Sequence, residues 1–371
     1  MNEILRLSED GKTLVEVTDK SVRSVTIPEG VTCIGDGAFS ECHALLSVQI
    51  PDTVLTIEKG AFYHCDQLGS VFIPDYVTEI GDDPFNCCFS LRCIEVGADN
   101  PYYSSEDGVL YDKTKTKIVR FPASNPITEF SIPYGVTVIL PCAFKDACLL
   151  KSLHLPDSVR DIGWWAFCNC RVLEKINIPS SVVEDVHGIF DYNESLPVED
   201  GIMYADTYLY KTVDKSQPSY AIKEGTRFIG DAAFMNCTQL CSIHFPDSIK
   251  EIDALAFSRC SSLETITIPD GVTRIGWEAF GHCPSLRSFE VGEGNEHFMS
   301  EEGILFDKAK TAILRLNLLS RSFLQPRIPL LHHHIVDGIS QCHGVADDDA
   351  DFLGPGDTCI NEVSQKRGCT W

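Results

Sequence analysis

The sequence is poor in the features that mark membrane proteins and nucleic-acid-binding proteins. It has no apolar run near the ~20 residues that a membrane-spanning helix needs, so we expect no membrane insertion. Basic residues are scarce, because 30 Lys and Arg stand against 54 Asp and Glu and give a net charge of -24. Since this charge repels phosphate backbones, nucleic acid is not an expected partner.

The sequence also lacks the motifs of common enzymes and metal sites. It has no G-x-S-x-G, H-E-x-x-H or G-x-x-x-x-G-K-[ST] motif, and no G-x-G-x-x-G after a strand. None of its 17 cysteines forms a C-x-x-C pair. The consecutive residues His332, His333 and His334 would alternate between two faces of a strand, so they cannot converge on one ion. We therefore predict a protein that is not an enzyme, with no catalytic residue, no metal and no cofactor.

Repeats fill most of the chain. An Ile-Pro pair at Ile27-Pro28 returns at Ile50-Pro51 and Ile73-Pro74, within the pattern I-P-x-x-V-x-x-I-G/E-x-x-A-F-x-x-C-x-x-L-x-x-V-x. The same period of 23 residues returns in two further sets of three coils, which begin at Ile132 and Ile222. A fixed period of about 20 to 30 residues is typical of a solenoid, in which each repeat forms one coil.

Each position of the repeat has a physical role in such a coil. In the second coil, the alternation Leu68-x-x-Val71-x-Ile73 predicts a short strand with one buried face, which ends at the proline because proline has no N–H. Stacking at the strand spacing of ~4.8 Å pairs these strands into a parallel sheet. The Phe position should form a buried file, which includes Phe39, Phe62, Phe234 and Phe257.

Seven cysteines share one repeat position, three residues after the Phe of the coil. We interpret them as a buried stack of small, weakly polar side chains in the core. Size rather than reactivity should govern this position, because Ala147 and Asn193 occupy it in the other two coils. The seven are Cys42, Cys65, Cys88, Cys170, Cys237, Cys260 and Cys283.

The L-x-x-V-x-I strand, followed by I-P, V-T-x-I-G and A-F-x-x-C, resembles the leucine-rich repeats of the BspA-like surface proteins of bacteria and some protozoan parasites. The resemblance implies a repeat solenoid of right-handed coils that is mainly β. It implies a parallel sheet on the concave side, short convex strands and short helical turns. It also implies a secreted or cell-surface location and adhesion to matrix proteins such as fibronectin or fibrinogen.

We expect three parts along the chain. Residues 1–26 should form an N-terminal hairpin or cap, residues 27–327 the solenoid, and residues 328–371 a degenerate coil with an irregular tail. Within the solenoid, coils occupy 27–95, 132–190 and 222–290, and islands that break the period occupy 96–131, 191–221 and 291–327. Each island holds two β-rich runs around a polar turn, as in "DGVLYDKTKTKIVRFP", which predicts a β-hairpin.

The outward face of the strands is the predicted binding surface. The residue just before the Ile of each Ile-Pro pair points away from the core, where an aromatic ring or imidazole can contact a partner. The alternative is that these residues are ordinary cross-strand neighbours. A second candidate site is the island hairpins, with Tyr102, Tyr103, Tyr111 and Tyr204. The strand-face candidates are Gln49, Phe72, Glu95, His154, Asn177, His244, Thr267 and Glu290.

These observations predict a non-enzymatic binding or adhesion protein. Its partner would be a protein or glycan on host or neighbouring cells, with extracellular matrix proteins among the candidates. The first residues, "MNEILRLSEDGK", lack the basic start and apolar core of a signal peptide. Two alternatives therefore stay open: a targeting or spacer module of a larger surface protein or enzyme, and an intracellular scaffold.

Overall fold

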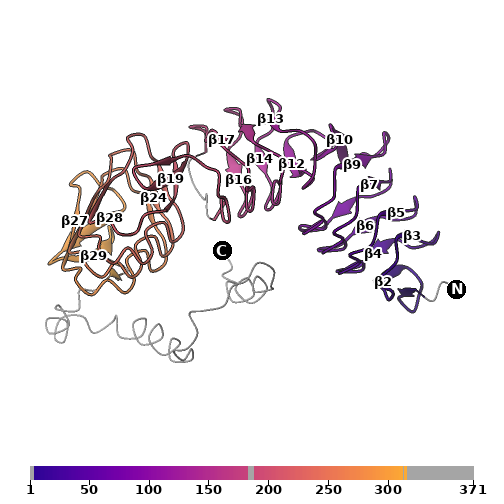
Figure 1. The fold of residues 1–371 in the computed structure, drawn as a ribbon, viewed down its shortest axis with the longest axis horizontal. Helices are drawn as coiled ribbons and strands as arrows, with labels where there is room; N and C mark the ends of the chain where they lie inside the picture. The colour runs from indigo at the N-terminus through magenta and orange to yellow at the C-terminus, as the bar shows by residue number, and fades with distance from the viewer. Residues whose placement is uncertain (1–3, 183–187, 312, 316–371) are drawn as a thin grey trace. The chain divides into compact units, whose positions relative to one another are not determined.

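The computed structural model describes residues 4–182, 188–311 and 313–315 (Figure 1). All of them belong to one compact unit, residues 1–318. They form a solenoid of stacked β-coils, as the repeat predicts. The predicted degenerate coil and tail at 328–371, with His332, His333 and His334, lie outside the described residues.

Parallel strands from the L-x-x-V-x-I segment of each coil line up as the first of two ladders, the long-strand ladder. Backbone pairing divides it, within the described residues, into five sheets of two or three strands. Its partners come from equivalent positions of successive coils, such as Val25 opposite Val48 and Phe130 opposite Leu153. Buried and exposed residues alternate along these strands, which confirms the predicted parallel sheet with one buried face. The strands are β3 (Ser24–Thr26), β5 (Ser47–Gln49), β7 (Ser70–Ile73), β9 (Cys93–Val96), β13 (Glu129–Ser131), β15 (Ser152–His154), β17 (Lys175–Ile176), β21 (Ser219–Ala221), β23 (Ser242–His244), β25 (Thr265–Ile268) and β27 (Ser288–Val291).

Strands of two residues from the V-T-x-I segment line up as the second ladder, the short-strand ladder, which is divided in the described part of the chain into three sheets, one for each set of coils. The repeat isoleucines lie opposite one another, as Ile34 opposite Ile57 and Ile229 opposite Ile252, and all four are buried. The proline-ended strand and this short strand thus supply two sides of each coil. The strands are β4 (Cys33–Ile34), β6 (Thr56–Ile57), β8 (Glu79–Ile80), β14 (Val138–Ile139), β16 (Asp161–Ile162), β22 (Phe228–Ile229), β24 (Glu251–Ile252) and β26 (Arg274–Ile275).

Consecutive tight turns, and not the expected short helical turns, form the corner that carries the Phe of each coil. In the first coil, the amide of Cys42 donates to the carbonyl of Phe39 at 3.1 Å, which is an i→i+3 turn. Gly37 (φ 61°) and Glu41 (φ 62°) have left-handed backbones on either side of the Phe, and such residues interrupt a right-handed helix. No helix is assigned within the described residues, so none there is long and apolar enough to cross a membrane.

The Phe side chains stack in a file through the core. Phe39, Phe62 and Phe85 follow one another with ring centroids 4.8 and 5.4 Å apart, and Phe234 stacks on Phe257 at 4.8 Å. All five are fully buried. The predicted file of aromatic side chains is therefore confirmed. Stacked rings at these distances add to the stabilisation from burial itself.

The cysteine position is buried, and it also supplies a hydrogen-bond donor. The Sγ of Cys65 donates to the carbonyl of Phe39 in the preceding coil at 3.3 Å. Where asparagine replaces the cysteine, Nδ2 of Asn193 donates to the equivalent carbonyl of Phe167 at 2.8 Å. The prediction that size governs this position is therefore incomplete, because the larger asparagine keeps the same hydrogen bond. The same contact joins Cys88 to Phe62, Cys170 to Phe144, Cys260 to Phe234 and Cys283 to Phe257.

Antiparallel strand pairs lie in the N-terminal segment and in each of the three islands. The second strand of a pair then continues the short-strand ladder, as Leu14 opposite Ile34, Ile118 opposite Ile139 and Leu209 opposite Ile229 show. A further strand, not expected from the sequence, precedes each island hairpin. The pairs are β1 (Leu5–Leu7) with β2 (Thr13–Val17), β11 (Val109–Asp112) with β12 (Lys117–Arg120), β19 (Ile202–Ala205) with β20 (Tyr208–Thr212), and β29 (Ile304–Asp307) with β30 (Ile313–Arg315); the preceding strands are β10 (Tyr103–Glu106), β18 (Val198–Glu199) and β28 (Phe298–Glu301).

The island hairpins bury both of their faces. On β11, Leu110 packs into the core of the first set of coils, whereas Val109 and Tyr111 pack into the core of the second set. On β19, Ile202 and Met203 divide in the same way between the third and second cores. The first and the second island are therefore layers that two sets of coils share.

A buried arginine also connects the first two sets. Arg120 ends β12, and its side chain is 3% exposed. Its Nη1 donates to Oδ1 of Asp83 at 3.0 Å and to the carbonyl of Cys142 at 2.7 Å. Because Asp83 belongs to the first set and Cys142 to the second, one guanidinium satisfies acceptors on both sides of the island.

Candidate functional site

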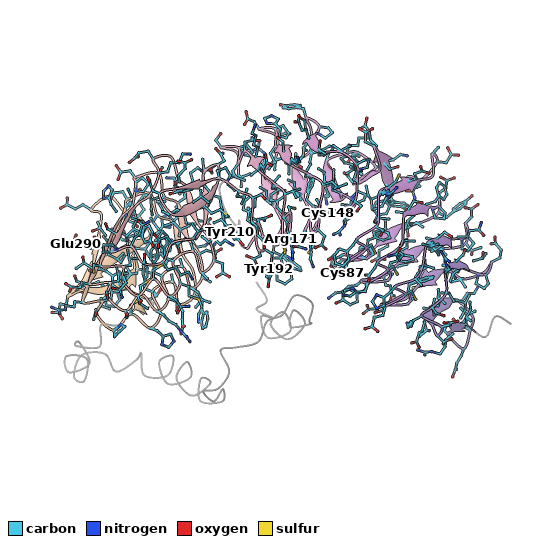
Figure 2. The ribbon with its side chains drawn as sticks, viewed as in Figure 1. Cys87, Cys148, Arg171, Tyr192, Tyr210 and Glu290 are labelled. Carbon is cyan, nitrogen blue, oxygen red and sulfur yellow. The ribbon has the colours of Figure 1, made fainter. Side chains whose placement is uncertain are left out.

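The predicted binding residues lie on the outward face of the long-strand ladder. Alternation along each strand turns their neighbours into the core, as in β7, where Val71 and Ile73 are buried and Phe72 is 50% exposed. Glu290, labelled in Figure 2, belongs to β27 and is exposed. The exposed candidates are Gln49, Phe72, Glu95, His154, His244, Thr267 and Glu290.

The ladder brings these candidates together in pairs. Phe72 lies directly opposite Glu95, so an apolar ring and a carboxylate are neighbours on adjacent strands. The hydroxyl of Thr267 donates to Oε2 of Glu290 at 3.1 Å. His154 and His244 lie opposite Ser131 and Ala221, and their imidazoles therefore stand beside small side chains.

Asn177 differs from the other candidates because its side chain is occupied in the fold. Its Oδ1 accepts from the amide of Leu155 and its Nδ2 donates to the carbonyl of Leu155, both at 2.8 Å. The adjacent strand β17 has only two residues, so this amide replaces the backbone groups that would extend the ladder. We therefore infer that the Asn177 side chain completes the ladder and does not contact a partner.

Three of the four island tyrosines are unsuitable for contacting a partner. Tyr111 and Tyr204 are 1% and 2% exposed, because the island hairpins are covered on both faces. The hydroxyl of Tyr103 accepts from the amide of Ile80 at 3.0 Å, which ties the island to the preceding coil. Only Tyr102, among these four, presents a large exposed surface.

Exposed aromatic residues also lie away from the ladder, where the sequence reasoning did not place a site. Tyr134 is 87% exposed, Trp277 67%, Tyr76 63% and Trp164 49%. Trp164 and Trp277 occupy the same repeat position, three residues before the Phe of their coils. The sequence signal for these two tryptophans was a large apolar residue at a repeat position that is polar or small in the other coils. The two tyrosines instead follow an Ile-Pro pair, so the four exposed rings do not share one repeat position, and they lie outside the ladder.

The thiols of the core are poor nucleophiles. Burial raises the pKa of Cys87 to about 12, and it raises the pKa of Cys142 to about 12 as well. On the long-strand ladder, burial and then the Glu95 carboxylate raise the pKa of the Cys93 thiol. A raised pKa keeps the thiol protonated, whereas nucleophilic cysteines need a lowered one. None of the 14 described cysteines forms a disulfide.

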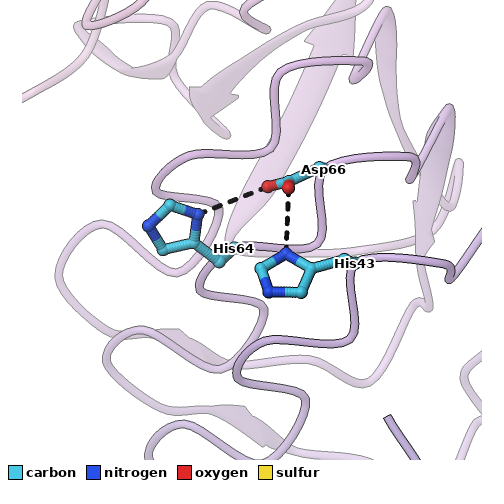
Figure 3. Close-up of side chains that lie close together, drawn as sticks. All are labelled: His43, His64 and Asp66. Atoms are coloured by element: carbon cyan, nitrogen blue, oxygen red, sulfur yellow. Dashed lines mark hydrogen bonds and ion pairs between the residues drawn. The ribbon is translucent and has the colours of Figure 1, made fainter. Parts of the chain in front are cut away.

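One cluster of metal-binding residue types is present among the described residues. His43, His64 and Asp66 each offer a ligand atom, and these atoms lie within 4.8 Å of one another (Figure 3). Nδ1 of His43 is 2.9 Å from Oδ2 of Asp66, and Nδ1 of His64 is 3.3 Å from Oδ1. In the sequence, metal ligands were sought among the cysteines and the consecutive histidines at 332–334. This group was missed, since His43 belongs to a different coil from His64 and Asp66.

The two ladders, the Phe file and the 23-residue register define the class of the protein as a leucine-rich-repeat solenoid. The family model described as "BspA type Leucine rich repeat region" matches residues 18–126, 114–198 and 206–302, with 6 copies. The chain belongs to this family, as the resemblance of its repeat pattern indicated. None of the curated proteins matches the chain.

Several solved structures are similar to the chain. A leucine-rich cell surface protein from Faecalibacterium prausnitzii A2-165 is 33% identical, with a TM-score of 0.44, over 73% of this chain and 60% of that one. A leucine-rich repeat protein from Eubacterium ventriosum is 21% identical, with a TM-score of 0.43, over 76% and 92%. The pneumococcal vaccine antigen PcpA is 20% identical, with a TM-score of 0.42, over 74% and 52%. The chain thus spans little more than half of PcpA.

Proposed function

We propose that the chain is a non-enzymatic binding module of a bacterial cell-surface protein, which contacts a protein or glycan through the outward face of the long-strand ladder. The observation that carries this proposal is the alternation along the strands, which exposes seven of the eight candidates on that face, including the half-exposed ring of Phe72. Membership in a family of surface proteins supports the location. An extended face of this kind offers area rather than a pocket, which suits a macromolecule.

The chemistry of the face indicates what kind of partner it would take. The seven exposed candidates include two carboxylates, two imidazoles and one aromatic ring, but no Lys or Arg. Such a face complements hydrogen-bond donors or positive charge on the partner, and the excess of acidic residues in the whole chain acts in the same direction. Association should therefore weaken as salt is added.

A binding comparison tests the proposal. The intact chain is screened against matrix proteins, glycans and bacterial surfaces, and any saturable partner is then titrated with the variant Phe72→Ala/His154→Ala/His244→Ala. We expect at least a tenfold loss of affinity, or about 1.4 kcal/mol, because these three are the aromatic and imidazole groups of the face. Their side chains are exposed, so the truncations should leave the fold intact.

A matched control carries three truncations of exposed rings outside the ladder, Tyr76→Ala/Tyr134→Ala/Trp277→Ala. These rings are more exposed than Phe72, so the control removes more accessible apolar surface. It should bind as the intact chain does. Loss of binding in the control alone would move the site off the ladder. No saturable partner in the screen would instead favour the spacer-module alternative.

A further inference from the structure

The stacking of adjacent coils brings His43, His64 and Asp66 together, although none of the three is a consensus residue of the repeat. His43 and Asp66 each follow the core cysteine of their coil, so they are 23 residues apart and lie on adjacent coils. His64 precedes the cysteine of the second coil, in a left-handed backbone with φ 56°. Because the repeat consensus has no histidine at these positions, the fold itself does not require the cluster.

Other coils confirm that the cluster is particular to this pair. The residues that flank the core cysteine elsewhere include Asn169 with Arg171, Asn236 with Thr238, Arg259 with Ser261 and His282 with Pro284. Within the described residues, the first two coils alone combine two imidazoles and a carboxylate in this way.

The spacing of the ligand atoms fits a tetrahedral ion. Bonds of about 2.0–2.1 Å to nitrogen and oxygen place neighbouring ligands of tetrahedral Zn²⁺ roughly 3.4 Å apart. The two Nδ1 atoms are 2.9 and 3.3 Å from the two oxygens of Asp66. An ion among the three groups therefore needs shifts of only a few tenths of an ångström between the imidazoles and the carboxylate. The two imidazoles must also approach each other from a separation of no more than 4.8 Å between ligand atoms.

The surroundings hold the groups in place and leave them open to solvent. The amide of His64 donates to the carbonyl of Asn86 at 3.0 Å, and the ring of Tyr63 meets the His64 ring edge-on at 4.5 Å. The side chains of His43, His64 and Asp66 are 57%, 31% and 33% exposed. An ion can thus enter directly from water, which would also fill the fourth coordination position.

We propose that His43, His64 and Asp66 form a site for a divalent transition-metal ion of the Zn²⁺ class. Two imidazoles and a carboxylate suit Zn²⁺ and its neighbours better than Ca²⁺ or Mg²⁺, which prefer sites made of oxygen ligands. The ion takes the place of the two N–H contacts to Asp66, and each neutral imidazole carries its proton on Nε2 instead. The site is independent of the ladder face and of the function proposed for it.

Calorimetric titration of the metal-free full chain with Zn²⁺ tests the site. Each protein compared carries His332→Ala/His333→Ala/His334→Ala, so that the histidine triplet contributes nothing. We expect one site in this background, and a fall in affinity of at least roughly tenfold in His43→Ala and in Asp66→Asn, since even outer-shell changes cost about 10–100-fold. The control His282→Ala should bind as the background does, because His282 holds the repeat position of His64 with a single carboxylate, Glu278, at 3.8 Å.

Replacement of Zn²⁺ by Co²⁺ distinguishes this site from the thiols. Nitrogen and oxygen ligation gives a visible ligand-field spectrum without the strong near-ultraviolet band of a cobalt–thiolate bond. That spectrum should disappear in both ligand variants while circular dichroism shows the fold unchanged. A thiolate band, unaltered affinity in His43→Ala and Asp66→Asn, or no binding by the background protein would each overturn the proposal.

Discussion

Replacing Asp191 with asparagine should stabilise the protein at neutral pH and leave its stability unchanged in acid. Asp191 follows the Phe of the last coil of the second set, and its Oδ2 accepts from Nε1 of Trp165 at 3.1 Å. Burial, and then the nearby Asp231 carboxylate, raise the pKa of Asp191 from 3.8 to about 6. Asparagine removes the charge and keeps a carbonyl oxygen for Trp165.

The sign and the magnitude follow from the difference between the folded and unfolded pKa values. The folded state holds the Asp191 proton more tightly, so this group imposes no cost below the unfolded pKa of 3.8. Stability is lost as the pH rises through the window from 3.8 to about 6, and the full cost applies above it. A shift of about two pKa units corresponds to about 3 kcal/mol, so Asp191→Asn should gain about 2–3 kcal/mol near neutral pH.

Urea denaturation followed by circular dichroism, in acid and at neutral pH, measures this gain. A solenoid can open locally, so hydrogen exchange at the Asn169 amide, which donates to the carbonyl of Asp191 at 2.7 Å, reports on the same coil. Asp214→Asn is the control of opposite sign, because a hydrogen bond from the Ser216 side chain lowers the pKa of Asp214. A gain in Asp191→Asn that is equal at both pH values, or absent at neutral pH, would refute the reasoning.

Three further tests concern the core and the corner of the coil. Phe62→Ala should cost about 3–5 kcal/mol by opening a cavity in the Phe file, measured by urea denaturation; a cost below 1 kcal/mol would contradict a continuous file. Asn193→Ala should cost about 1–3 kcal/mol by leaving the Phe167 carbonyl unpaired, whereas Asn193→Cys should restore most of it; equal melting temperatures of the two variants would argue against the donor. Gly60→Ala should cost about 1 kcal/mol because Gly60 has φ 58°, and Ala232→Gly, at φ 52°, should show no such loss in a thermal melt.

The sequence determined the coil because its pattern is local and repeats in register. Once one strand ends at Ile-Pro, the residues 23 positions later must meet it, which places Val48 against Val25 and Phe62 against Phe39. The short helical turns that the family resemblance implies for the corner were a wrong prediction. The corner has left-handed residues such as Glu41, and the type of that side chain gives no sign of such a backbone.

The candidate surface was predictable where strand alternation alone decides exposure. Alternation places Phe72 outside and Val71 inside, and the structure agrees. Asn177 follows the same rule in sequence, but the short strand β17 leaves Leu155 without backbone partners and draws in the amide. The sequence period already places His43 and Asp66 on adjacent coils, but it gives no sign of the left-handed backbone of His64, the third member of the cluster.

The islands interrupt the repeat period of the sequence, but they do not interrupt the hydrophobic core of the solenoid. Leu110 and Tyr111 are consecutive on β11, and they belong to the cores of different coil sets. Phe121, beyond β12, stacks on Phe144 with ring centroids 5.1 Å apart and so begins the Phe file of the second set. A flexible linker would let the sets unfold independently. A strand that each set needs to complete its own core couples them, so loss of either face of β11 should weaken the coils on both sides.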